Sequence, residues 1–312
     1  MTSLRAIADT DLIEVERGGV SYKATGAQLQ DQLVQPYAVP YSARFTGNSG
    51  KAYLWQNTSG GNRKVTTISF WIKLHEAKGT GISDYGPGVL AIGDNNVGGN
   101  FGEIILDSAN KLGVLMGSGG ALYTRSATTK PVLNSWEHWC FQINTGVGGA
   151  DSCKFYRNGT KIGTGALKNS FGDLSGTGSK SMNTAFNQAM SGTFNTYNQN
   201  AAVGNGNKAI QKGYVIGQGR LDASGYGFGW VDYINATFAD FHLIDGQALA
   251  PTAFAHNVGG WKAKRYEGTY GTNGFHLTFE VSGNPGKDFS GRNNNFTKVG
   301  TINRSTGGPP AA

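Results

Sequence analysis

Residues 227–254, GFGWVDYINATFADFHLIDGQALAPTAF, decide how the fold of the chain is interpreted. The central run TFADFHLI carries apolar groups on both faces, as expected of a central strand in a sandwich. Asp245-Gly246 then closes the strand, because an aspartate side chain can hold a tight turn and glycine tolerates positive φ. Pro251 stands where a short helix would start, and Phe254 is expected to pin that turn onto the sandwich. The stretch contains no acid–base pair, metal-ligand spacing or phosphate loop, so it indicates architecture.

The composition of the whole chain favours an all-β fold. Charged residues make up 15% of the 312 residues, against roughly a quarter in ordinary globular domains. Glycine is abundant, with 49 residues, whereas prolines number only 8. The glycines show no three-residue period, which excludes collagen, and the frequent aromatics argue against disorder. Many short strands joined by tight turns explain this composition best.

Charge and hydropathy argue against two classes of partner. The formal net charge is +7, but the basic residues are scattered singly, and the densest cluster, GWKAKRYEG, already contains an acid. Without a basic stripe or a binding motif, we expect no nucleic-acid partner. No apolar run approaches the roughly 18 to 20 residues that a spanning helix needs, so we expect no membrane insertion.

The start of the chain and its two cysteines favour reduced thiols. MTSLRAIADTDLIEVERGG turns acidic before an apolar core could form, so no signal peptide is expected. Cys140 and Cys153 flank one hairpin turn but are offset from direct opposition. A disulfide also needs an oxidising compartment, which a chain without a leader rarely meets, so both cysteines are predicted to be reduced.

Alternating patterns predict several strands after residue 43. EIILDS and KLGVLMG are expected to pair through SAN, and Asn158-Gly159 suits the positive φ values that a type I′ hairpin turn demands. TTISFWIKL and WEHWCFQIN each alternate with a period of two, which places one apolar face toward a core. The residues expected on those faces are Ile68, Phe70, Ile72, Leu74, Trp139, Phe141 and Ile143.

Residues 1–36 differ from the rest of the chain and are followed by a linker at 37–42. DLIEVERGGVSYKATG predicts two short strands about a Gly18-Gly19 turn, and TGAQLQDQLV predicts a short helix. So small a unit cannot bury enough apolar surface to stand alone, and it is therefore predicted to dock on a partner. The expected docking and oligomer contacts are Leu12, Ile13, Val15, Val20, Tyr22, Leu29 and Leu33.

A polar tract at about residues 164–211 is rich in Asn, Ser and Gly and contains isolated aromatics. Loops this long in a compact domain are usually either functional or disordered. Sugars stack on exposed aromatic rings and hydrogen-bond to amides, which makes the tract a candidate for glycan contact. Loop aromatics also serve as local staples, and Asn-rich tracts as subunit contacts. The candidate glycan residues are Phe186, Phe194, Asn195, Tyr197 and Asn198.

The strand and turn motifs together resemble a known family. GNRKVTTISFWIKL, WEHWCFQI, KFYRNGTKIG, YVIGQGR, the stretch quoted at the start, WKAKRYEGTYGTNGFHLTFE and DFSGRNNNFT follow the order found in the concanavalin A-like, laminin-G-like jelly-roll domain of tailed-bacteriophage virion proteins. The resemblance implies an all-β, two-sheet antiparallel sandwich over residues 43–312, with the tract at 164–211 as an unusually long insertion. DTDLIEVERGGVSYKATGAQL also looks like the N-terminal segment that many phage structural proteins carry.

The sequence offers no convincing catalytic group. Glucanases of this fold carry a Glu-x-Asp-x-x-Glu strand, and the nearest stretch, GEIILD, has only Glu103 and Asp107, which we interpret as a solvated strand end. No histidine has metal-ligand spacing or a serine elbow nearby, so all are interpreted as satisfied core or surface residues. These histidines are His75, His138, His242, His256 and His276. We therefore expect a protein that is not an enzyme.

No metal or other cofactor is predicted. DNNVGGNFGE imitates a calcium loop, but it has glycine at position five and Ile105 at the bidentate position. A structural calcium ion at turn residues such as Asp222 or Asp288 remains an alternative without direct support. Asp288 and Ser290 are expected instead to hold a tight turn, with Gly291 at positive φ.

The patterns and the resemblance lead to a functional hypothesis. We expect a structural component of a phage virion, assembled in the host cytoplasm and docked by its N-terminus to other virion proteins. A tail fibre, tail appendage or head fibre displaying the sandwich for host-glycan contact or particle stabilisation is the first interpretation. A capsid decoration protein, a soluble glycan-binding lectin and a degraded glycan hydrolase are the alternatives. The resemblance also implies a homo-oligomer, with a trimer favoured.

Overall fold

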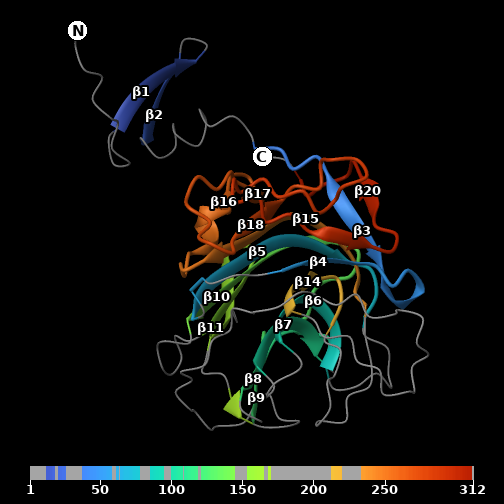
Figure 1. Ribbon diagram of the computed structural model, residues 1–312. Helices are drawn as coiled ribbons and strands as arrows, with labels where there is room; N and C mark the ends of the chain where they lie inside the picture. Colours follow the sequence, from blue (N-terminus) through green and yellow to red (C-terminus); the bar gives the residue numbers. More distant parts are fainter. Residues whose placement is uncertain are drawn as a thin grey trace, which may run out of the picture.

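Two antiparallel sheets stacked face to face make up the body of the protein (Figure 1), which confirms the predicted all-β jelly-roll sandwich. The computed structural model describes residues 12–17, 20–25, 37–57, 61–62, 64–77, 85–94, 100–107, 109–118, 121–144, 153–164, 168–169, 212–219 and 233–310.

The first sheet has the strand order β12-β11-β10-β5-β15-β3-β20, and β18 also pairs with β15. All of its pairs are antiparallel, and β5 and β15 lie at its centre. Its strands are β3 (Ser42–Thr46), β5 (Val65–Leu74), β10 (Trp136–Asn144), β11 (Cys153–Arg157), β12 (Thr160–Thr164), β15 (Asn235–Asp245), β18 (Phe275–Leu277) and β20 (Asn303–Ser305).

The second sheet has the order β13-β9-β8-β7-β6-β14-β4-β19 and is also antiparallel. The predicted hairpin of EIILDS and KLGVLMG is confirmed, because β7 and β8 pair from Leu106 opposite Leu112. Its strands are β4 (Tyr53–Gln56), β6 (Tyr85–Asp94), β7 (Asn100–Asp107), β8 (Leu112–Ser118), β9 (Ala121–Ser126), β13 (Lys168–Asn169), β14 (Lys212–Ile216) and β19 (Thr297–Val299).

Aromatic side chains from both central strands of the first sheet fill the core between the sheets. Phe70 of β5 stacks on Phe241 of β15, with ring centroids 4.9 Å apart, and its edge meets Phe238 at 5.8 Å. Each such ring stabilises the fold by about 1.5–3 kcal/mol through burial. The predicted inward positions of TTISFWIKL and WEHWCFQIN are all confirmed as core residues.

A third, partial layer covers the outer face of the first sheet (Figure 1). It contains the 3-10 turn η3 (Pro251–Ala253) and the small hairpin of β16 (Ala255–Asn257) and β17 (Trp261–Ala263). Trp71 lies on the face of β5 opposite the predicted apolar face, and it is buried with Ala239 beneath this layer. Trp71 is therefore buried even though it points away from the core between the sheets.

The corner that ends β15 forms as predicted. The carboxylate of Asp245 accepts hydrogen bonds from the backbone N–H groups of Asn62 at 2.8 Å and Asn273 at 3.0 Å. Gly246 follows with φ +97°, and η3 begins at Pro251. Phe254 is buried against the outer face of the sheet, which confirms its expected role of pinning the turn.

Two further predictions, one about the Asn158-Gly159 turn and one about the offset of the two cysteines, are confirmed. Asn158 and Gly159 have φ values of 45° and 75°, as a type I′ turn requires. Cys153 lies opposite Ile143, whereas Cys140 lies opposite Tyr156, so the two thiols are offset. Both cysteines are buried thiols that form no disulfide with each other.

The N-terminal hairpin also forms as predicted. Strands β1 (Leu12–Arg17) and β2 (Val20–Thr25) pair antiparallel, with Arg17 opposite Val20. They form a two-stranded sheet that is separate from the sandwich sheets (Figure 1). The helix expected at TGAQLQDQLV lies outside the described residues.

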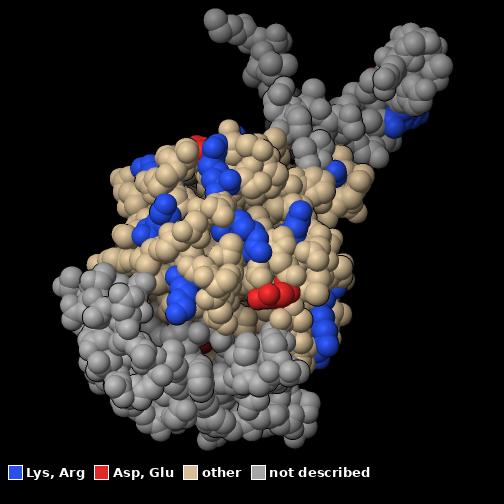
Figure 2. Space-filling model, turned by 90° about the vertical axis from the view of Figure 1, so that its right-hand side faces the viewer, with Lys and Arg blue, Asp and Glu red and all other residues tan. Residues whose placement is uncertain are grey.

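The described surface carries isolated charges. On the face in Figure 2, Lys and Arg side chains lie in separate groups among uncharged residues. Within the described ranges, no helix has the length and apolarity needed to cross a membrane.

Asp245 provides a test of the corner that ends β15. Asp245→Ala should lower the free energy of unfolding by about 2–4 kcal/mol, because it leaves two backbone donors without their acceptor. Thr252→Ala, at a nearby exposed position, should change it by no more than about 0.5 kcal/mol. Urea unfolding of both variants measures the difference, and equal stabilities would contradict the role of Asp245.

Candidate functional site

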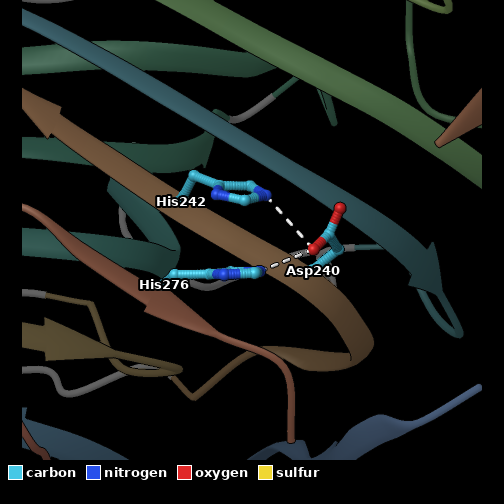
Figure 3. A group of neighbouring side chains, drawn as sticks. All are labelled: Asp240, His242 and His276. Carbon is cyan, nitrogen blue, oxygen red and sulfur yellow. Dashed lines mark hydrogen bonds and ion pairs between the residues drawn. The ribbon is translucent and has the colours of Figure 1, made fainter. Parts of the chain in front are cut away.

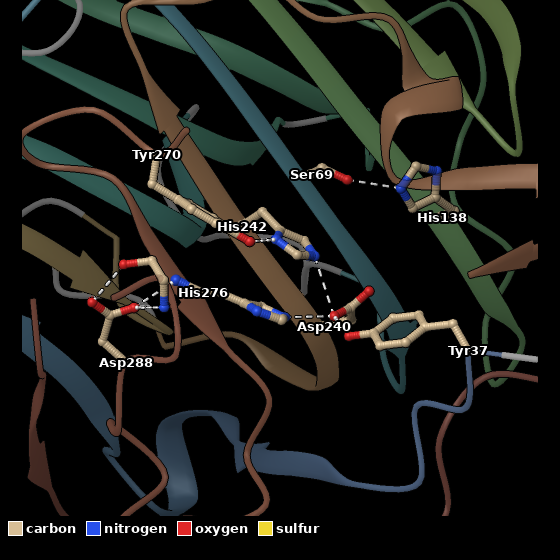
Figure 4. Close-up of polar contacts among 9 residues, drawn as sticks. Tyr37, Ser69, His138, Asp240, His242, Tyr270, His276 and Asp288 are labelled. Carbon is tan, nitrogen blue, oxygen red and sulfur yellow. Dashed lines mark hydrogen bonds and ion pairs between the residues drawn. The ribbon is translucent and has the colours of Figure 1, made fainter. Parts of the chain in front are cut away.

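Five polar side chains meet on the outer face of the first sheet (Figure 4). They come from the segment before β3, from β15, from β18 and from the loop between β17 and β18. Most are buried, with Asp240 2% and His242 1% exposed. We call this group the polar cluster: Tyr37, Asp240, His242, Tyr270 and His276.

A β-bulge places Asp240 in the polar cluster. The register of β15 against β5 shifts between Ala239 and His242, and Asp240 has φ +47°, a conformation that aspartate tolerates better than most residues. The extra residue reverses the phase of the strand, so that Phe238 and Phe241 both enter the core. Asp240 therefore lies on the outer face beside its neighbour Ala239, and His242, two residues further along, lies on the same face by ordinary alternation.

One oxygen of Asp240 is the centre of the cluster. Oδ1 accepts hydrogen bonds from the hydroxyl of Tyr37 at 2.8 Å and from Nε2 of His276 at 2.7 Å. Nε2 of His242 lies 3.2 Å from the same oxygen (Figure 3). Burial acts to raise the pKa of the Asp240 carboxyl, but the two neighbouring histidines outweigh it and hold this pKa well below its usual range. The carboxylate is thus a buried anion surrounded by donors.

The two histidines of the cluster stack on each other. The ring centroids of His242 and His276 are 4.0 Å apart, with planes inclined by 16°. Burial, and then the neighbouring charge of His276, lowers the pKa of His242 to about 4. His242 is therefore neutral at neutral pH, and its Nδ1 lies 2.9 Å from the hydroxyl of Tyr270. Burial and the negative charge of Asp240 raise the pKa values of Tyr37 and Tyr270, so both remain phenols.

Beside the cluster, His138 and Ser69 lie as close together as a catalytic base and its nucleophile. The hydrogen bond between them runs in the wrong direction for catalysis. Nε2 of His138 lies 2.8 Å from the hydroxyl of Ser69, and the indole N–H of Trp261 donates to Nδ1 of His138 at 3.0 Å. An indole can only donate, so Nδ1 is the acceptor and the single proton of the neutral ring sits on Nε2. His138 thus donates to Ser69 and cannot take the proton of that hydroxyl. The arrangement holds β17 onto the sheet and does not activate a nucleophile.

Asp288 holds a turn, as predicted, and its oxygens are fully used. Oδ1 accepts from the N–H groups of His276 and Ser290, and Oδ2 accepts from the Ser290 hydroxyl and the Asn294 N–H, all at 2.8–2.9 Å. Gly291 has φ +81°. These donors occupy the positions that a calcium ion would need, so Asp288 does not fit a calcium site. Asp222 lies outside the described residues.

The interpretation of Glu103 and Asp107 as a solvated strand end is wrong. Glu103 is 1% and Asp107 3% exposed. Strand β7 lies inside the second sheet, where Glu103 is flanked by buried Ala91 and Leu115, so its outer face is not a free edge. Oδ1 of Asp107 accepts the N–H groups of Ala109 and Lys111 at 2.8 Å each, which assigns this carboxylate to the β7–β8 turn.

The other predicted site residues fall largely outside the described part. Leu12, Ile13, Val15, Val20 and Tyr22 lie on β1 and β2. The remaining docking residues and all the glycan candidates lie outside it: Leu29, Leu33, Phe186, Phe194, Asn195, Tyr197 and Asn198. Their roles stay predictions.

The polar cluster was missed because its members are distant in sequence. Asp240 and His276 are 36 positions apart, and Tyr37 is 203 positions from Asp240. The histidines are isolated from one another along the sequence. In the folded protein His242 and His276 stack on each other, so the interpretation as isolated residues is wrong for these two. One local signal was present, since an aspartate between alanine and phenylalanine in the middle of an apolar strand has to be paired if the strand is buried.

His138 provides a test of how burial affects stability. Burial lowers its pKa to about 3 in the folded protein, below the value of about 6.5 for an exposed histidine. As the pH falls below about 6.5, the unfolded chain binds a proton that the folded chain does not, and stability is lost toward pH 3. Below about pH 6.5, the free energy of unfolding of the unsubstituted protein, relative to that of His138→Gln, should therefore fall by about 1.4 kcal/mol for each unit by which the pH decreases.

Urea unfolding between pH 8 and 5 measures this slope. Ser69→Ala is the matched control, because it removes the hydroxyl next to His138 but keeps the buried ring, and it should retain the slope. Parallel curves for the unsubstituted protein and His138→Gln would contradict the expected burial of a neutral histidine.

Comparison with known proteins supports the fold assignment. Residues 46–197 match the Laminin_G_3 family, described as the concanavalin A-like lectin/glucanases superfamily. No curated protein matches the chain. A putative carbohydrate binding protein from Bacteroides ovatus ATCC 8483 is 14% identical, with a TM-score of 0.50 over 87% of this chain and 61% of that one.

Two other similar structures are more distant. A heptameric SAP-like pentraxin from Limulus polyphemus is 16% identical, with a TM-score of 0.39 over 69% of this chain and 80% of that one. Tailspike protein 2 of bacteriophage CBA120 is 13% identical, with a TM-score of 0.33 over 81% and 31%. The family match over residues 46–197 and the two stacked antiparallel sheets agree on a concanavalin A-like jelly-roll sandwich as the fold.

Proposed function

We propose that this protein is a non-catalytic structural component of a tailed-phage virion. In this proposal residues 1–36 dock it to other virion proteins, and the sandwich faces outward, where it contacts host-surface glycan or stabilises the particle. The observation that carries the proposal is the β1–β2 hairpin, which pairs with neither sheet of the sandwich. The resemblance of DTDLIEVERGGVSYKATGAQL to the N-terminal segment of phage structural proteins supports it.

The register of the hairpin divides the positions of β1 and β2 between two faces. Directly opposed residues of an antiparallel pair share a face, and alternate residues along each strand do so too. Exposed Glu14 lies opposite exposed Lys23, and Leu12 occupies a position of the same phase on β1, so its docking role stays a prediction. The positions of the other phase are Ile13, Val15, Arg17, Val20, Tyr22 and Ala24, and we propose that the apolar residues among them make the docking contact.

The polar groups of the sandwich support binding or scaffolding more than catalysis. Retaining and inverting glycosidases need two carboxyl groups facing one cleft, about 5 to 9.5 Å apart. Asp107, Asp245 and Asp288 each accept backbone N–H groups at turns, and Asp240 is surrounded by donors. None of these four carboxylates fits the role of acid or nucleophile.

Placement on the particle distinguishes the remaining candidates. We favour a tail fibre or appendage, with a trimer as the oligomer, over a head fibre or a capsid decoration protein. Counting copies per particle by quantitative mass spectrometry separates them, since hundreds of copies would mean decoration. A glycan array distinguishes the soluble lectin, and release of reducing ends would reveal a hydrolase.

Deleting residues 1–36 should separate docking from folding. The shortened protein should retain the circular dichroism and the thermal transition of a β-sandwich, because the sheets and Tyr37 remain. It should be absent from assembled particles, because the apolar face of the hairpin is gone. Val15→Asp should reproduce this loss by placing a charge in a desolvated contact.

Glu14→Gln is the matched control on the opposite face and should join particles at the normal occupancy. Immunoblots of purified particles give the occupancy. A folded, shortened protein that still joins particles would refute docking through residues 1–36.

A further inference from the structure

We propose that Asp240, His242 and His276 bind a divalent transition-metal ion of the Zn²⁺ type. Among the described residues they form the one group of three His, Cys, Asp or Glu side chains whose donor atoms converge, with one donor atom of each within 4.8 Å of the others. Figure 3 shows both imidazole rings presenting Nε2 to the same side of the Asp240 carboxylate.

The surroundings of Nε2 of His242 suit a metal ligand. It is buried and lies 3.2 Å from Oδ1 of Asp240, close enough for an ion pair but too poorly aligned for a hydrogen bond. If Nε2 carries the proton, a buried donor is poorly satisfied; if Nδ1 carries it, a lone pair faces a carboxylate oxygen. A metal ion bound to both atoms removes the conflict.

The distances require only a small adjustment. Zinc binds nitrogen and carboxylate oxygen at about 2.0–2.2 Å, which places tetrahedral ligand atoms about 3.3 Å apart. Oδ1 lies 2.7 Å from Nε2 of His276 and 3.2 Å from Nε2 of His242. These two separations therefore have to increase by about 0.6 Å or less to admit the ion. The imidazole rings, whose planes are inclined by 16°, also have to turn so that both Nε2 atoms face the same ion.

The surrounding groups suit such a site. The hydroxyl of Tyr270 can accept from Nδ1 of His242, which would leave Nε2 free for the metal, and the Tyr37 hydroxyl donates to the carboxylate. Histidine ligands in metal sites are usually oriented by hydrogen bonds of this kind. The side chain of His276 is 13% exposed, which provides a route from solvent.

The donor set also selects the metal. Two imidazole nitrogens and one carboxylate oxygen suit Zn²⁺, Co²⁺ or Ni²⁺, whereas Ca²⁺ takes six to eight oxygen ligands. The site differs from the calcium alternatives considered for the sequence, because it uses strand residues and nitrogen donors.

The test uses the untagged full-length protein, treated with EDTA and then titrated with Zn²⁺ or Co²⁺ against a chromophoric chelator. We expect one equivalent of Zn²⁺ per chain, a rise in melting temperature, and the visible absorption of tetrahedral Co²⁺. Ca²⁺ at the same concentration should not raise the melting temperature. Absence of Zn²⁺ uptake by the folded protein, or an equal response to Ca²⁺, would overturn the proposal.

Variants distinguish this site from other histidines. His276→Gln, at the partly exposed position, should abolish the stoichiometric uptake, and Tyr270→Phe should weaken it about 10- to 100-fold. His256→Gln, a histidine on β16 outside the cluster, should bind as the unsubstituted protein does. Unchanged uptake by a folded His276→Gln variant would also overturn the proposal. The test does not depend on substituting the buried Asp240, because Asp240→Asn can fail to fold.

Discussion

The outer half of this structure depends on the β-bulge at Asp240. Strand β15 is the centre of the first sheet, and the bulge lets it supply Phe238 and Phe241 to the core on one side. On the other side, it exposes a carboxylate and an imidazole to whatever covers the sheet. A bare jelly-roll sheet could leave these groups in water, but here they are buried, so partners have to come from elsewhere in the chain.

Those partners come from segments distant in sequence. His276 and Tyr270 belong to the C-terminal third, and Tyr37 lies directly after the N-terminal 36 residues. The guanidinium of Arg265 lies 5.3 Å from the ring of Tyr37, which adds a cation–π contact to the same junction. The buried charge thus ties the segment before β3 and the C-terminal third of the chain to the central strand. It also anchors Tyr37, the residue that follows the N-terminal 36 residues, to the sandwich.

The sequence predicted the strands, turns and core well, because these depend on local chemistry. Period-two alternation identified Phe70 and Phe141, and Asn-Gly and Asp-Gly pairs located two turns. The polar cluster escaped prediction, because only the register shift of β15 and the pairing of β18 bring Asp240 and His276 together. Glu103 was misjudged for a related reason: whether a strand lies inside or at the edge of a sheet is a property of topology.

The direction of each hydrogen bond decides what the buried histidines can do. The indole of Trp261 forces His138 to donate to Ser69, so this pair holds a layer in place and cannot deprotonate the serine. Around His242 no such fixed donor exists, because the Tyr270 hydroxyl can either donate or accept. Tyr270 therefore does not fix the proton of His242, and without a metal ion the Asp240 carboxylate beside Nε2 favours the proton on that nitrogen. The same layer of side chains thus contains one histidine, His138, whose role is fully determined by its neighbours and one, His242, whose Nε2 would bind the ion of the proposed metal site.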